Sequence, residues 1–152
     1  TPVLEVEEHL WDEVFATNVK GILFCSQAVA PSMAQRMSGK IINIASVAGF
    51  VGTSSWSAYC ASKAAAISLT MAFADELKHH NVHVNVICPG ATDTPMTKYI
   101  AQTEKESAFD HVHSPAEVAD EVRKLVVPFE QSTSGRVVAM KSLDLVLGLP
   151  TR

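Results

Sequence analysis

Several features that would point to a specialised class of protein are missing from this sequence. Its cysteines, Cys25, Cys60 and Cys88, are few, odd in number and far apart. We therefore expect no disulfide framework, but buried free thiols in a reducing compartment, by default the cytoplasm. No apolar run approaches the ~20 residues of a membrane helix, and residues 1–5 lack the basic and apolar regions of a signal peptide.

Positive charge is also scarce, because the formal net charge is −4. Proteins that bind a polyanion usually carry a basic patch, so nucleic acid and anionic membranes are not expected as partners, and a small neutral ligand fits better. With 152 residues, 47% hydrophobic and 18% charged, the composition is that of a globular protein. No internal repeat or linker divides the chain, which predicts a single domain over residues 1–152.

The spacing of apolar residues predicts the order of elements. Helical spacing from Glu7 to Met37 indicates one long or kinked helix. Lys40 to Ala45 is short, β-branched and nearly uncharged, which is typical of a strand buried on both faces. After a loop over Val47 to Trp56, we expect an Ala-rich helix from Ser57 to His79 and a strand from Val82 to Ile87. Strand, helix and strand in this order predict a parallel sheet.

The last third of the chain is less regular. Ala91 to Val112 is polar and only weakly periodic, as expected of a lid over a pocket. Ser114-Pro115-Ala116-Glu117 has the N-cap, first-turn proline and acidic third residue that open a helix, here an amphipathic one reaching Val126. Arg136 to Met140 is the last expected strand.

Three side chains suit proton-transfer chemistry. Tyr59 and Lys63 are four residues apart on the expected helix, so they share a face. A neighbouring ammonium favours the phenolate over the phenol and could bring the tyrosine pKa from ~10 towards neutrality. Ser46 ends the preceding strand, at the edge where parallel sheets place their ligands, and its hydroxyl could hold a substrate oxygen.

Four segments together resemble the classical short-chain dehydrogenases/reductases, and the likeness covers almost the whole chain. Asn18-Val19-Lys20-Gly21 is similar to the family's helix motif with a catalytic Asn, and Asn43-Ile44-Ala45-Ser46 to its strand motif ending in the catalytic Ser. Tyr59-Cys60-Ala61-Ser62-Lys63 matches the Tyr-x-x-x-Lys signature. Residues 85–94, Asn-Val-Ile-Cys-Pro-Gly-Ala-Thr-Asp-Thr, resemble the Asn-x-x-x-Pro-Gly-x-x-x-Thr segment at the nicotinamide.

The resemblance implies a Rossmann-like α/β fold with a doubly wound parallel sheet, of which this chain would hold the C-terminal portion, about three strands with flanking helices. It implies an oxidoreductase that moves hydride between NAD or NADP and an alcohol or carbonyl. Tyr59 would transfer the proton, Lys63 would lower its pKa and bind the nicotinamide ribose, Ser46 would polarise the carbonyl and Asn18 would hold a relay water. The segment bordering the nicotinamide would contribute Pro89, Gly90, Thr92 and Thr94.

Two departures from the family pattern limit these expectations. The Gly-rich phosphate loop has no counterpart among the seven glycines, so the chain resembles the C-terminal part of a longer enzyme, and NAD cannot be told from NADP. The usual Asp-Gly-Gly near the C-terminus is replaced by residues 143–148, Leu-Asp-Leu-Val-Leu-Gly, which puts the subunit contact there in doubt.

An alternative therefore stays open beside the enzyme. A doubly wound sheet cut through its middle leaves a bare strand edge and uncovered helix faces. The chain could be a catalytically silent truncated form, or a pairing module that binds a full-length homologue. The two long helices resemble those through which the family forms dimers and tetramers, so a homo-oligomer is expected in either case.

The remaining aromatic and histidine residues leave alternatives open. His79, His80 and His83 have no supporting Cys or carboxylate cluster, and we expect no metal site. His111 and His113 flank the expected lid and could touch substrate, although exposed loop histidines are common. Trp56 could equally line a substrate pocket or anchor its loop.

Overall fold

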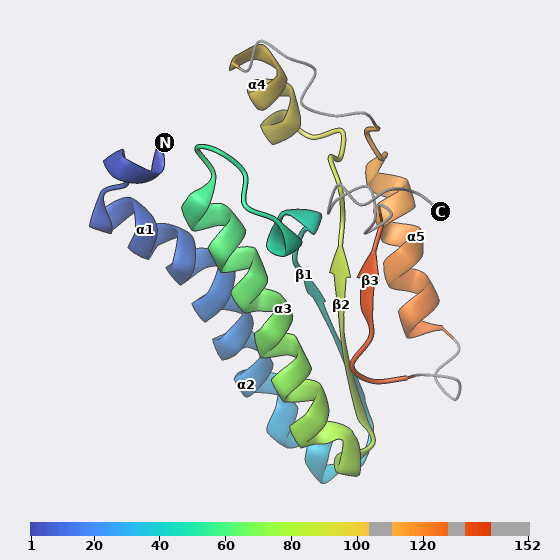
Figure 1. Cartoon of the computed structure of the whole chain (residues 1–152). Coiled ribbons are helices and arrows are strands. Elements are labelled where there is room, and N and C mark those ends of the chain that lie inside the picture. The colour runs from blue at the N-terminus through green and yellow to red at the C-terminus, as the bar shows by residue number, and fades with distance from the viewer. Residues whose placement is uncertain (104–110, 128–132, 141–152) are drawn as a thin grey trace, which may run out of the picture.

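The chain folds around a parallel three-stranded sheet in the order β1-β2-β3 (Figure 1). The computed structural model describes residues 1–103, 111–127 and 133–140. The strands are β1 (Gly39–Ile44), β2 (Val82–Cys88) and β3 (Val137–Ala139). The register pairs Gly39 with Val82 and Val86 with Val137. The predicted parallel α/β arrangement is confirmed.

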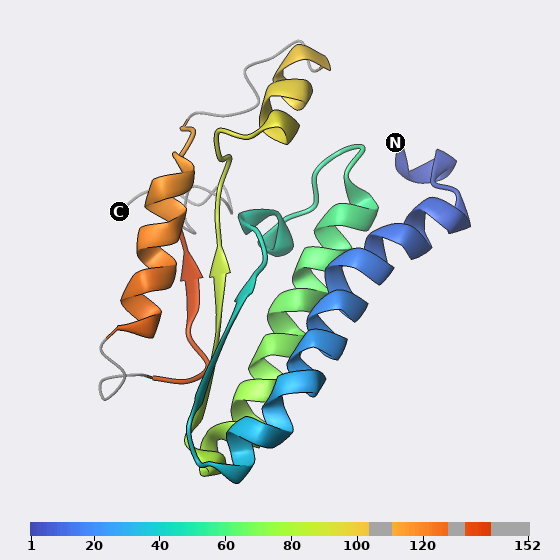
Figure 2. The same cartoon turned by 180° about the vertical axis from the view of Figure 1, so that it is seen from behind.

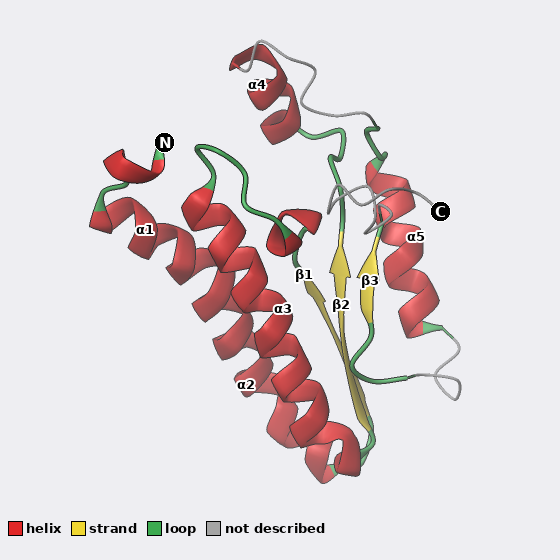
Figure 3. Ribbon diagram, in the orientation of Figure 1, coloured by secondary structure: helices red, strands yellow, loops and turns green. Residues whose placement is uncertain are grey.

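Helices cover the sheet on both faces (Figures 2 and 3). The long helices α2 (Gly21–Gln35) and α3 (Ser57–Leu77) lie side by side against one face, and α5 (Pro115–Val126) lies against the other. Ile41 points to the α2/α3 side, where it packs in a cluster with Ala30, Ala74, Val82 and Val84. Lys40 points to the α5 side and donates hydrogen bonds from Nζ to the carbonyls of Leu125 and Val126, at 3.1 and 2.7 Å.

The expectation that the first strand is buried on both faces is wrong. Its residues alternate between buried and more exposed positions, and the side chain of Ile44 is 42% exposed. The α2/α3 face buries Gly39, Ile41 and Asn43, whereas α5 covers only part of the other face. The strand that is buried on both faces is the central one, β2, in which every residue except His83 is buried.

The expected long helix is present but is kinked. It consists of α1 (Glu8–Phe15), a five-residue π-helical turn (Ala16–Lys20) and α2. Such turns inside α-helices are frequently found at functional sites, and this one contains Asn18. Helix α3 can pack closely against its neighbours because four of its buried residues have small side chains: Ser62, Ala66, Thr70 and Ala74.

Other predicted segments gain detail in the structure. The loop over residues 47–56 begins with a 3-10 turn, Val47–Phe50. The lid segment contains a helix, α4 (Pro95–Thr103), so the expectation of an irregular segment there is partly wrong; residues 104–110 lie outside the described part. Another 3-10 turn, Val3–Glu5, opens the chain, and one over Lys78–His80 follows α3. The departure noted at residues 143–148 also falls outside the described residues.

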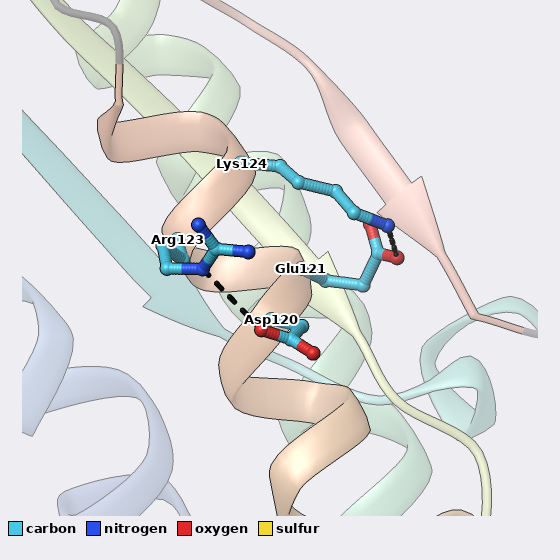
Figure 4. A network of polar contacts seen from close by, with 4 residues as sticks. All are labelled: Asp120, Glu121, Arg123 and Lys124. Carbon is cyan, nitrogen blue, oxygen red and sulfur yellow. Dashed lines mark hydrogen bonds and ion pairs between the residues drawn. The ribbon is translucent and has the colours of Figure 1, made fainter.

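Helix α5 begins as its sequence predicts and exposes a charged face. Ser114 Oγ accepts a hydrogen bond from the Glu117 amide at 3.2 Å, and the Glu117 carboxylate accepts one from the Ser114 amide at 2.6 Å. Figure 4 shows two ion pairs further along, Arg123 with Asp120 at 3.3 Å and Lys124 with Glu121 at 2.6 Å. Exposed pairs of this kind contribute at most about 1 kcal/mol each.

Among residues 1–103, 111–127 and 133–140, none of the helices combines the length and hydrophobicity that crossing a lipid bilayer requires. The cysteine expectation holds for two of three residues: Cys60 and Cys88 are buried free thiols, but Cys25 is exposed on α2.

The 3-10 turn after β1 can pack on α3 only because residue 49 is glycine. A Cβ at Gly49 would lie 2.9 Å from the backbone carbon of Lys63 and 3.0 Å from the Ala64 nitrogen, and the helix backbone cannot move aside easily. We predict that Gly49→Ala lowers the free energy of unfolding by about 1–3 kcal/mol, measured by chemical denaturation. Gly52→Ala in the same loop is the control, because a Cβ there meets nothing within 4 Å. Equal stability of the two variants would contradict this packing.

Candidate active site

The site is built where β1 and β2 end side by side. The Pro89 carbonyl, just after β2, accepts hydrogen bonds from the Val47 amide at 3.0 Å and from Ser46 Oγ at 3.5 Å. Because the strands are parallel, their carboxyl ends lie at one edge of the sheet, where ligands bind in open α/β sheets. The structure thus brings Ser46 and the Pro89-Gly90 segment together, as the sequence predicts.

Tyr59 lies in the first turn of α3, close enough to this edge for its hydroxyl to share a hydrogen bond with Ser46. Burial raises the pKa of Tyr59 above its usual 10.0, and the hydrogen bond with Ser46 lowers it by less. Ser46 Oγ is itself held by the Ala48 amide at 3.2 Å. The pair of hydroxyls is therefore positioned on one small surface, with the phenol protonated at neutral pH.

Lys63 lies one turn further along α3, and its ammonium is over the Tyr59 ring, with Nζ 5.6 Å from the ring centroid. Nζ donates a hydrogen bond to the Ile44 carbonyl at 3.3 Å. Burial lowers the pKa of Lys63. The expected approach of Tyr59 and Lys63 is confirmed. The pKa of the phenol is raised, because burial outweighs the other influences on it, and its lowering during catalysis stays a prediction.

The buried thiol of Cys88 lies beneath this arrangement at the end of β2. Burial raises its pKa to about 11, against smaller lowering effects of Ser46 and Lys63. Cys88 is therefore a neutral thiol at physiological pH and packs as an apolar side chain. It supplies no charge that would compete with Tyr59 for the Lys63 ammonium.

Asn18 reaches the same helix from the π-helical turn. Its Nδ2 donates to Ser62 Oγ at 3.0 Å, and Ser62 Oγ donates to the Tyr59 carbonyl at 2.7 Å. Asn18 is thus tied to the turn of α3 that carries Tyr59 and Lys63. Its predicted function in a water relay stays a prediction.

The segment after Gly90 runs from β2 to α4. Thr92 Oγ1 donates to the Gly90 carbonyl at 3.2 Å, and Thr94 Oγ1 lies 3.3 Å from Thr97 Oγ1 in the first turn of α4. Thr92 also forms an isolated β-bridge with His113. Pro89 therefore lies next to the Ser46 hydroxyl and Thr92 is tied to the Gly90 carbonyl, whereas Thr94 lies at the start of α4.

A cavity of about 310 Å³ opens beside Tyr59. Its walls come from α1, from the loop before α3 and from α4, and its lining side chains are Thr1, Val6, Leu10, Val14, Ser55, Trp56, Ser57, Ala58, Tyr59, Met96 and Ile100. Trp56 is one of the residues that line this cavity, and its ring packs edge-on against Tyr59 with 5.8 Å between ring centroids. Of the two positions expected for Trp56, the structure therefore favours the pocket wall. The sequence did not indicate the contributions of Val6, Leu10 and Val14, although their helical spacing marks one apolar face.

Comparison with known proteins agrees with this geometry. The sequence pattern of the family described as short chain dehydrogenase matches residues 1–105. The chain belongs to this family. It is 32% identical over 143 residues to the 3-oxoacyl-[acyl-carrier-protein] reductase FabG of Thermotoga maritima, covering 91% of this chain and 58% of the relative. This short-chain dehydrogenase chain thus spans less than two thirds of the length of the curated relatives it matches.

Solved structures show the same fold. A crystal structure of acetoin dehydrogenase from Enterobacter cloacae superimposes with a TM-score of 0.82 at 30% identity, over 100% of this short-chain dehydrogenase chain and 62% of that protein. 4-Hydroxyisoleucine dehydrogenase complexed with NADH gives a TM-score of 0.79 at 28% identity, over 92% of this chain and 61% of the other. The sheet and its helices are therefore part of a Rossmann-like fold. The compounds after which these relatives are named differ widely.

The ionisation of Tyr59 can be measured directly. The chain has two tyrosines, so in a Tyr99→Phe protein the phenolate absorbance reports Tyr59 alone. We predict a midpoint above pH 10, because burial raises the pKa. Adding Ser46→Ala should raise it further by removing the hydrogen bond that lowers it, whereas Ser54→Ala in the exposed loop should not. A midpoint below 10 in folded protein, checked by circular dichroism, would contradict the site geometry.

Proposed function

We propose that this chain carries the proton-transfer centre of a nicotinamide-dependent oxidoreductase acting on an alcohol or a carbonyl. The observation that carries the proposal is the position of Tyr59, which lines a largely apolar cavity and interacts with the Ser46 hydroxyl, with the Lys63 ammonium over its ring. Membership of the short-chain dehydrogenase family supports the same chemistry.

In this proposal Tyr59 is the acid and base. A protonated phenol at neutral pH can give its proton to the oxygen of a carbonyl that is being reduced, and the phenolate can take it back in the oxidative direction. Ser46 would donate a hydrogen bond to the same oxygen, which favours the negative charge that develops there. Lys63 would stabilise the phenolate left after proton transfer, because an ammonium nearby favours that form.

The residues present fit the nicotinamide end of NAD or NADP. Gly90 has no side chain to cover its own backbone, a Cβ there would contact the His113 ring at 3.6 Å, and the Lys63 ammonium lies at the same edge of the sheet. The cofactor, when bound, would supply or accept the hydride. The residues proposed to hold it are Asn18, Tyr59, Lys63, Pro89, Gly90, Thr92 and Thr94.

The cavity points to the class of substrate. Seven of its eleven lining residues are apolar, and no charged side chain is among those that the structure describes. A charged substrate group would lose its hydration there without a partner, at a cost of several kcal/mol. We therefore propose a small neutral alcohol or carbonyl compound with an apolar portion beside the reacting carbon.

Association with further copies is part of the proposal. Leu10, Trp11, Phe24 and Val29 on α1 and α2 are 37–60% exposed, a density of apolar surface that favours a homodimer or homotetramer. The exposed Ile44 side chain on β1 favours a second candidate, a catalytically silent chain that pairs with a longer homologue. We propose a cytoplasmic location, since reduced thiols persist there.

Nucleotide binding separates the two candidates. The purified chain is titrated with NADH and with NADPH while the fluorescence of its tryptophans and of the nucleotide is followed. Saturable binding supports the enzyme. If folded protein binds neither nucleotide, the chain is the silent form, and its mass in solution shows whether it pairs.

We predict that Tyr59→Phe lowers turnover at least ~100-fold, because the variant keeps the ring but loses the transferable proton. Nucleotide affinity should change by no more than about twofold. Turnover is followed by the absorbance of the reduced nicotinamide, and Tyr99→Phe on exposed α4 is the matched control. An unchanged rate in Tyr59→Phe would sink the assignment.

A charge placed in the cavity tests the substrate class. Ile100→Glu puts a carboxylate into the apolar wall, and we predict a fall in kcat/KM of roughly tenfold or more for an apolar ketone. Gln102→Glu adds the same charge to an exposed position of α4 and should leave kcat/KM nearly unchanged. Equal values in the two variants would argue against this cavity as the substrate site.

A further inference from the structure

Two histidines and one glutamate gather at the start of α5, where the His113 ring borders Gly90 and the His113 backbone pairs with Thr92. His111, His113 and Glu117 each offer one ligand atom, and these atoms lie within 4.8 Å of one another. The imidazole rings of the histidines are in edge-on contact, with centroids 4.5 Å apart. We propose that this cluster binds a divalent cation of the zinc type, held by two imidazoles and one carboxylate.

The local structure explains why these three residues meet. His113 lies in a β-bridge with Thr92, and residues two apart in extended chain point to the same side, which brings His111 alongside. Glu117 is the third residue of α5, one turn after the histidines. The backbone of His113 is fixed by hydrogen bonds in both directions, to the Ala91 carbonyl and from the Asp93 amide, each at 2.8 Å.

The carboxylate is already oriented for ligation. Its Oε2 accepts hydrogen bonds from the amide and the hydroxyl of Ser114 at 2.6 and 2.9 Å, which leaves Oε1 available. The Ser114 hydrogen bonds lower the pKa of Glu117, with smaller contributions from the two histidines, so the carboxylate is ionised. A ligating carboxylate with its second oxygen held in this way has the outer-shell support that metal sites require.

The distances and the surroundings suit an ion. Around zinc, with bonds of 2.0–2.1 Å, ligand atoms lie about 3.3 Å apart, so the cluster is at most about 1.5 Å too open and side-chain rotations can close it. A polar cavity of about 400 Å³ between α5 and β3 is lined by His113 and Glu117, by Asp120, and by the ion pair of Glu121 with Lys124. It offers a route for a cation from solvent.

Imidazole and carboxylate together select zinc and its neighbours over magnesium, which prefers oxygen ligands alone. A bound ion would link the N-terminus of α5 to the β-bridge at Thr92 and thus to the segment entering α4. The site is therefore proposed to be structural, and it does not depend on the proposed oxidoreductase activity.

The test is calorimetric titration of tag-free protein with zinc chloride. We expect one saturable site that Glu117→Gln and His111→Asn each weaken at least tenfold, together with a rise in melting temperature on zinc addition that both variants lose. Glu117→Gln suits this purpose because glutamine retains the capping box of α5. His80→Asn, at an exposed histidine outside the cluster, is the control and should bind zinc as the unaltered protein does. Absence of saturable binding, or equal affinity in His111→Asn, would overturn the proposal.

Discussion

The parallel pairing of β1 with β2 is the constraint on which the site depends. It sets the register in which Ala45 donates to the Ile87 carbonyl at 2.8 Å and Val47 to the Pro89 carbonyl at 3.0 Å. A shift of this register by one residue would separate Ser46 from Pro89-Gly90 and would turn every side chain of β1 to the other face. Burial of β2 on both sides makes such a shift costly, since Val84 and Val86 on one face and Asn85 and Ile87 on the other are all buried.

The helix α3 converts this edge of the sheet into a reactive centre. Its small buried residues allow it to lie close to β1 and β2, and the buried hydrogen bond from Asn43 to Thr70, at 3.0 Å, fixes its position along the strand. Tyr59 and Lys63 are then carried to the strand ends by rigid elements. This is the preorganisation that proton transfer requires, since a small displacement of the phenol would remove it from Ser46.

The sequence allowed the sheet, its parallel order and the grouping of Ser46, Tyr59 and Lys63 to be predicted, because short-range patterns and the geometry of parallel strands determine them. It did not predict the direction in which the pKa of Tyr59 is shifted. That shift depends on burial by residues that are distant in sequence, and the charge of Lys63 suggested the opposite. The cavity wall from Leu10 and Val14, and the meeting of His111 with Glu117, likewise depend on how separate elements pack. The full burial expected for β1 failed for the same reason.

The π-helical turn at Ala16–Lys20 sets the rotational phase of the helix around it. In an uninterrupted α-helix, at ~100° per residue, Val14 in α1 and Ser26 in α2 would point ~120° apart. The rotation per residue is smaller in the π turn, so part of that angle is removed and both side chains can face α3. One continuous helix can then line the cavity with its first half, through Leu10 and Val14, and cover the core with its second, through Ser26 and Ala30. Removing one residue from this turn would rotate the two halves of the helix out of phase. The shape of the pocket therefore depends on the length of this turn as well as on the side chains that line it.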